Sequence, residues 1–72
     1  MKLQVDRETD ALYLRLDDSK VIESEQVAPG VVLDFNDVNE VVGIEILHLS
    51  RRRSAIDVDK FVFETAAAAS HR

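Results

Sequence analysis

Two apolar runs, VVLDFN at residues 31–36 and VVGIEI at residues 41–46, decide the fold of this 72-residue chain. Apolar residues recur at every second position in both runs, which is typical of half-buried β-strands. Residues 37–40 predict a four-residue connection, so that the runs form an antiparallel hairpin. A shift by one residue would move every apolar side chain to the opposite face, so the pattern specifies the register. The expected facing pairs are Val31 with Ile46, Val32 with Glu45, Leu33 with Ile44, Asp34 with Gly43 and Phe35 with Val42.

The same alternation continues from the hairpin toward the N-terminus, in shorter runs separated by polar turns. It predicts strands at residues 2–5, 11–16 and 21–27, and the last of these is polar enough for a sheet edge. Pro29 and Gly30 suit the two central positions of a type II turn, because Pro fixes its own φ and Gly tolerates a positive φ.

The alternation breaks after residue 50, where SRRRS indicates a loop or a short helical turn. Residues 60–64 predict a last strand, and a helix over residues 54–69 is the alternative because the alanine run favours helix. We therefore expect a mainly β fold, a small curved antiparallel sheet of four or five strands with a short helical turn after residue 50. The alternative is α+β with a C-terminal helix. Residues 1–65 would form a single domain and residues 66–72 a flexible tail.

The composition restricts the classes of function. Fourteen acidic and nine basic residues give a net charge of −5, which repels phosphate backbones and makes nucleic acid an unexpected partner. The absence of cysteine removes disulfides and thiolate zinc sites, and it fits a cytoplasmic location. No run approaches the roughly 18 apolar residues of a membrane span, and the first residues lack the apolar core of a signal peptide. A domain this small has a thin core, so we expect a homo-oligomer, most simply a homodimer.

Three blocks in the first 50 residues carry a resemblance to a known family. They are VDRETDALYLRL at residues 5–16, SEQVAPGVVLD at residues 24–34 and VVGIEIL at residues 41–47. Together they resemble the small prokaryotic domains of unknown function in the family numbered 2283. The resemblance implies no established activity. Toxin-like genes beside some members imply an antitoxin-like role as one expectation. This chain departs from the family pattern at Asn39, where Gly is usual, and at residues 48–50.

Two carboxylates of the hairpin are candidates for chemistry. Asp34 and Glu45 are diagonal neighbours in the expected register, roughly 7–8 Å apart, a separation that paired acid and base carboxylates can use. Arg15 would join them on the outer face if its strand lies beside the hairpin. The favoured interpretation is a solvated charge cluster of Arg15, Asp34 and Glu45, since a sheet this small offers little room for a desolvated pocket. Gly43 indicates either a close approach by a backbone or ligand, or a bend or bulge.

Several apolar side chains are expected on that same outer face, which is unusual for a surface exposed to water. They are candidates for a homodimer interface unless the last strand covers them. The candidates are Tyr13, Val32, Val41, Leu47 and Leu49.

The remaining polar motifs predict little chemistry. His48 and His71 have no Cys and no suitably spaced His, so no metal site is expected. The three arginines at residues 51–53 have no aromatic residues between them and are expected in a solvated loop or in salt bridges to a partner.

These observations favour a non-enzymatic protein-interaction module that acts as a homo-oligomer and needs no cofactor. The first alternative is an antitoxin-like partner of a small toxin. The second is a hydrolase using Asp34 and Glu45.

Overall fold

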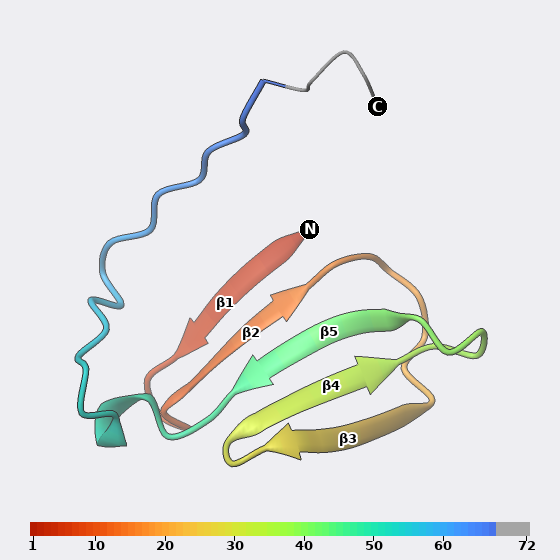
Figure 1. The fold of residues 1–72 in the computed structure, drawn as a ribbon, viewed down its shortest axis with the longest axis horizontal. Coiled ribbons are helices and arrows are strands. Elements are labelled where there is room, and N and C mark those ends of the chain that lie inside the picture. Colours follow the sequence, from red (N-terminus) through yellow and green to blue (C-terminus); the bar gives the residue numbers. More distant parts are fainter. Residues whose placement is uncertain (68–72) are drawn as a thin grey trace.

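The computed structural model describes residues 1–67, which form one antiparallel sheet of five strands followed by a short 3-10 helix (Figure 1). The order of the strands across the sheet is β1-β2-β5-β4-β3. The predicted mainly β fold with a short helical turn is confirmed. The elements are β1 (Lys2–Asp6), β2 (Ala11–Arg15), β3 (Glu23–Ala28), β4 (Val31–Phe35), β5 (Val41–Ile46) and η1 (Leu49–Arg51).

The hairpin of β4 and β5 has the predicted register except at its loop end. Four of the five expected pairs form, whereas Phe35 faces Val41 and not Val42. The side chain of Asn36 explains the difference. Its Oδ1 accepts the backbone N–H of Glu40 at 2.9 Å, and the Asn36 N–H donates to the carbonyl of Glu40 at 3.0 Å. The loop therefore closes between Asn36 and Glu40, and the extra residue of β5 is accommodated as a β-bulge.

The other predicted strands form with small changes at their ends. The strand expected at residues 21–27 runs from Glu23 to Ala28, and it is an edge strand whose residues are all exposed. Gly30 has a φ of +75°, as its predicted place in a type II turn requires.

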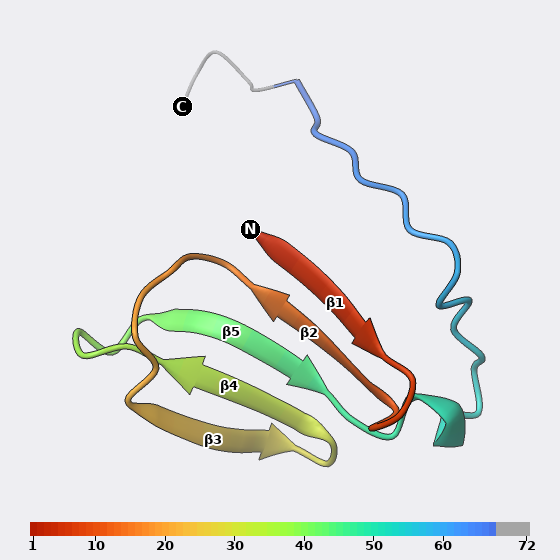
Figure 2. The same ribbon diagram turned by 180° about the vertical axis from the view of Figure 1, so that it is seen from behind.

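The prediction for the C-terminal segment is wrong. Residues 60–64 form no strand, and the alternative helix over residues 54–69 does not form in the described part of that range. Instead a turn is closed by a hydrogen bond from Lys60 N–H to the Asp57 carbonyl (3.3 Å), and the chain leaves the sheet in an extended path (Figure 2). Without a neighbouring strand, the alternating pattern lacks the backbone partners that a strand requires. Of the predicted tail, residues 68–72 lie outside the described residues.

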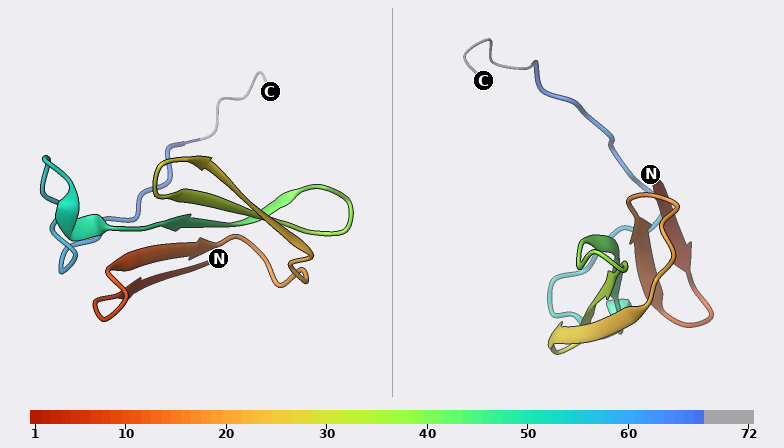
Figure 3. Two further views of the ribbon diagram at one scale, coloured as in Figure 1. Left: turned by 90° about the horizontal axis from the view of Figure 1, so that it is seen from below. Right: turned by 90° about the vertical axis from the view of Figure 1, so that its right-hand side faces the viewer.

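The described residues form a single layer, and the sheet is twisted and curved (Figure 3). Val42 is fully buried and Leu49 is nearly so, and no other apolar side chain in the described part of the chain is fully buried. The buried core is small because no second layer within residues 1–67 covers either face of the sheet.

Candidate functional site

One face of the sheet, which we call the polar face, is organised around Asp34 on β4. This carboxylate is 6% exposed. Its Oδ2 accepts a hydrogen bond from the Tyr13 hydroxyl at 2.9 Å, and its Oδ1 accepts one from the Ser24 hydroxyl at 2.6 Å. Tyr13 comes from β2 and Ser24 from β3, so the three residues connect three of the five strands. Both oxygens of the buried carboxylate are thus satisfied within the chain.

Gly43 on β5 leaves the space through which Tyr13 reaches Asp34. A Cβ at residue 43 would lie 2.4 Å from the Tyr13 hydroxyl oxygen and 2.9 Å from Cζ of the ring. The group that closely approaches Gly43 is therefore an aromatic side chain of a neighbouring strand, and not the backbone or ligand that was one of the two predictions. The β-bulge lies directly beside it, between the pairs Asp34–Gly43 and Phe35–Val41. Covering a strand glycine with an aromatic ring is a known way of stabilising a sheet.

The environment of Tyr13 raises its pKa above the ordinary value of 10.0. Burial of the hydroxyl is the main cause, because it disfavours the phenolate. The hydrogen bond to the Asp34 carboxylate and the negative charge of that group act in the same direction, while Arg15 opposes them. Tyr13 is thus held as a protonated donor to Asp34 at neutral pH.

The predicted charge cluster shares one face but forms no ion pair. Arg15 and Asp34 both lie beside Gly43, on opposite sides of β5, and Glu45 lies between Tyr13 and Val32. Arg15 donates through Nε to the carbonyl of Asp17 at 2.7 Å and through its terminal nitrogen to the carbonyl of Ser19. The guanidinium therefore holds the turn after β2, whereas Asp34 is bound by hydroxyl groups.

The five predicted interface residues do not form one surface. Tyr13 and Val32 lie on the polar face, where each is directly opposite Glu45. Val41 lies at the bulge, and Leu47 follows β5. Leu49 is buried within its own chain, at 6% exposure.

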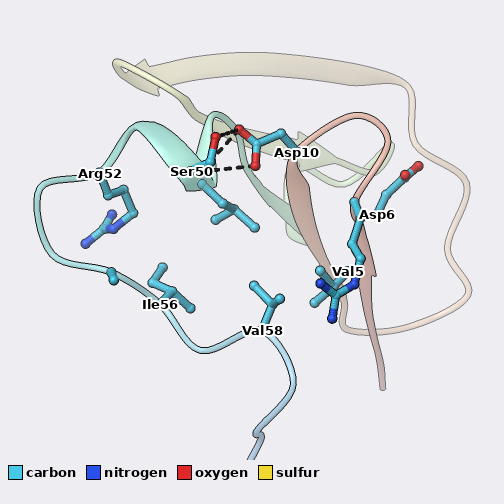
Figure 4. A pocket seen from close by; sticks show the side chains of 10 residues that line it. Val5, Asp6, Asp10, Ser50, Arg52, Ile56 and Val58 are labelled. Carbon is cyan, nitrogen blue, oxygen red and sulfur yellow. Dashed lines mark hydrogen bonds between the residues drawn. The ribbon is translucent and has the colours of Figure 1, made fainter.

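Leu49 contributes to a pocket of 340 Å³ between the β1–β2 turn, η1 and residues 55–58 (Figure 4). Asp10 forms its rim and links the turn to η1. The Asp10 carboxylate accepts the Ser50 backbone N–H at 3.0 Å and the Ser50 hydroxyl at 2.7 Å, and the Asp10 carbonyl accepts the Leu49 N–H at 3.0 Å. The polar groups of this rim are therefore used to anchor the 3-10 helix.

Sequence reasoning missed Ser24, Asn36, Asp10 and Ser50 as structural residues. Asn36 could have been found, since Asn before a short hairpin loop commonly bonds to the backbone two residues on. The other three depend on partners 10 or 40 residues away, so no local pattern reveals them.

The opposite side of the sheet, which we call the apolar face, carries two cross-strand rows of aliphatic side chains. The register aligns the members of each row, and all of them are half-buried. The first row is Leu3, Leu14, Ile44 and Leu33, and the second is Val5, Leu12, Ile46 and Val31.

Metal and membrane sites are not evident in the described residues. Within residues 1–67, no three side chains of His, Cys, Asp or Glu are grouped to hold a metal ion. His48 is exposed and has a left-handed backbone, with a φ of 57°. His71 lies outside the described residues. No helix in the described range is both long and apolar enough to cross a membrane.

The fold and these two faces define a class of protein: a small single-sheet β domain with one hydrogen-bonded polar face and one open apolar face. The chain belongs to the family described as protein of unknown function (DUF2283), whose model matches residues 2–50. The match includes all five strands, and Asp10 and Ser50 as well. No curated protein and no solved structure matches the chain significantly.

Proposed function

We propose that this chain is a non-enzymatic protein-interaction module that acts as a homodimer through its apolar face. One observation carries the proposal: eight aliphatic side chains in two aligned rows remain half-buried, with no second layer of described residues over them. A sheet normally buries such a face against another layer. A second copy supplies an identical apolar face of matching size.

The energetics of a small domain support the same proposal. Burial of apolar surface contributes about 25 cal/mol per Å², and a 72-residue chain with one layer has little of it to offset conformational entropy. Stacking two sheets face to face would convert both half-buried faces into a shared core.

The polar face favours a role other than catalysis. The Asp34 carboxylate already accepts hydrogen bonds from Tyr13 and Ser24 at its two oxygens, so it is committed to cross-strand contacts. We therefore expect the Asp34→Asn and Glu45→Gln proteins to give the same activity as the wild-type protein in every hydrolase assay. Activity that both substitutions abolish would contradict it.

Two substitutions of matched chemistry test the dimer proposal. Ile44 lies at the centre of the apolar face, and Val32, on the adjacent strand, faces the opposite side. We expect wild-type protein and the Val32→Asp variant to have the mass of a dimer in analytical ultracentrifugation, and the Ile44→Asp variant to be a monomer. A concentration of about 100 μM is on the order of the dissociation constants of the weakest specific complexes. A wild-type protein that is monomeric at this concentration would overturn the proposal. If Ile44→Asp does not fold by circular dichroism, Leu33→Ser is a milder change on the same face.

The antitoxin-like alternative has one observation in its favour. The edge strand β3 exposes Glu23 and Glu25, and the chain has a net charge of −5, so a basic protein would be attracted to this edge. Co-expression with the product of a neighbouring toxin-like gene tests it. Co-purification that is lost in a Glu23→Gln/Glu25→Gln variant would support this function, and no association would exclude it for that gene.

A further inference from the structure

We infer that the C-terminal arm, defined as residues 52–67, is part of the dimer interface and lies against the second copy of the chain. This inference rests on the proposed homodimer and adds the segment and the arrangement that complete it. The arm is extended and runs along the β1 side of the sheet (Figures 1 and 2).

The arm exposes large apolar side chains that its own sheet does not cover. Phe61 and Phe63 are each 66% exposed, and Val62 is 64% exposed. Phe61 and Phe63 line a shallow pocket with Met1, Leu3 and Leu14, at the β1 margin of the apolar face. The aromatic side of the arm therefore borders the surface that a second copy would cover.

The area available shows why the arm is needed. Four strands spaced about 4.8 Å apart and about 17 Å long give the apolar face a plan area of roughly 300 Å². A stable interface buries about 800 Å² on each partner. An aromatic side chain buries about 150–250 Å², and Phe61 and Phe63 are each 66% exposed, so together they add roughly 200–300 Å². The face alone falls short of this area, and the two aromatic side chains of the arm bring the interface closer to it.

Charge selects between the two ways in which two such faces can stack with two-fold symmetry. Glu23 and Glu25 on β3 are paired with Phe35 and Leu33, so they point to the same side as the apolar rows. An axis perpendicular to the strands would place β3 over β3 and bring these glutamates against their own copies, which is unfavourable.

An axis parallel to the strands instead places β3 and β4 of one copy over β1 and the arm of the other. In this arrangement Glu23 and Glu25 of one copy lie apart from those of the other. Phe61 and Phe63 of each arm then cover the β4 side of the other sheet.

The first test compares two double variants of the full chain. Phe61→Ser/Phe63→Ser removes the aromatic side of the arm, while Lys60→Ser/Glu64→Ser changes the same number of residues at even positions of the same extended segment. We expect the aromatic variant to raise the dimer dissociation constant by at least about tenfold, and the control to change it by less than about threefold. Unchanged circular dichroism confirms that the sheet remains folded. A dimer unaffected by the loss of both aromatic side chains would overturn the role of the arm and leave the proposed homodimer intact.

The second test uses the absence of native cysteine. Leu33→Cys and Phe61→Cys proteins are mixed and oxidised, and a disulfide between them requires the arm of one copy to lie over β4 of the other. We expect this mixed disulfide to form in preference to the two symmetric ones. If instead a Leu3→Cys/Phe61→Cys protein forms only an intrachain disulfide and the mixture forms none, the arm packs on its own sheet and the inference fails. A protein that is monomeric throughout would overturn the proposed function itself.

Discussion

At the scale of single residues, the hydrogen bond between Tyr13 and Asp34 is the contact whose loss we expect to lower the free energy of unfolding most clearly. Tyr13→Phe keeps the ring over Gly43 but removes one of two donors to a buried carboxylate. Because hydrogen bonds to charged groups are worth about 1.5–3 kcal/mol, we expect the free energy of unfolding in urea to fall by that amount. In an Asp34→Ala background the same substitution should have a much smaller effect, and an equal effect in both would contradict the pairing.

The raised pKa of Tyr13 gives a pH dependence. Below about pH 10 the phenol is protonated in the folded and unfolded chains alike, so its full contribution to stability is present. As the pH rises further, the unfolded chain ionises first, and this contribution is lost as the pH passes through the higher pKa of the folded state. The stability difference between wild-type and Tyr13→Phe proteins should therefore shrink above about pH 10. Tyr13 is the sole tyrosine, so phenolate absorbance reports its pKa directly.

Gly43 gives a third prediction at this scale. In Gly43→Ala, the new Cβ would overlap the Tyr13 hydroxyl and ring, so the ring must move away from Asp34. We expect a loss of about 1–3 kcal/mol in the free energy of unfolding, the usual cost of overpacking. Combining Gly43→Ala with Tyr13→Ala removes the clash, and the alanine at residue 43 should then cost little. A similar cost with and without the aromatic ring would show that backbone freedom, and not the close approach, requires glycine.

At the scale of elements, the β4–β5 loop depends on the backbone of Asn39, which has a φ of 64°. This left-handed conformation suits Gly and is tolerated by Asn, but it costs about 1–2 kcal/mol for most other residues. We expect Asn39→Val to lower the unfolding free energy by that amount and Asn39→Gly to be close to neutral. Asp37→Val, at an exposed loop position without a positive φ, is the control and should change stability by less than about 0.5 kcal/mol. Equal losses at residues 37 and 39 would argue against the conformational explanation.

At the scale of the whole molecule, dimer formation makes stability depend on concentration. Folding and association are then linked, so each tenfold rise in protein concentration favours the folded dimer by about 1.4 kcal/mol. For a dimer of two 72-residue chains this corresponds to a rise of about 3–5 °C in Tm. The Ile44→Asp protein should show a Tm independent of concentration. A constant Tm for the wild-type protein would agree with a monomer and contradict the proposed function.

The sequence by itself determined the strands and the pairing of the central hairpin. Period-two alternation specifies which side of each strand is apolar. A one-residue shift in the pairing of Leu33 with Ile44 would place apolar side chains on the opposite face, so the local pattern specifies the register. The turn at Gly30 follows from residue chemistry in the same way. Family membership also follows from the sequence, since the matched blocks lie in these strands.

Only the tertiary structure decided how the elements meet. Placing β2 beside β5 brings Tyr13, Gly43 and Asp34 together, and no pattern within one strand specifies that arrangement. The path of residues 60–64 was mispredicted because a β-rich composition becomes a strand only when a neighbouring backbone supplies hydrogen bonds. Hydrogen bonds to a neighbouring strand, like the contacts of Asp34, join residues that are distant in the sequence. The fold of the whole chain therefore determines whether they form.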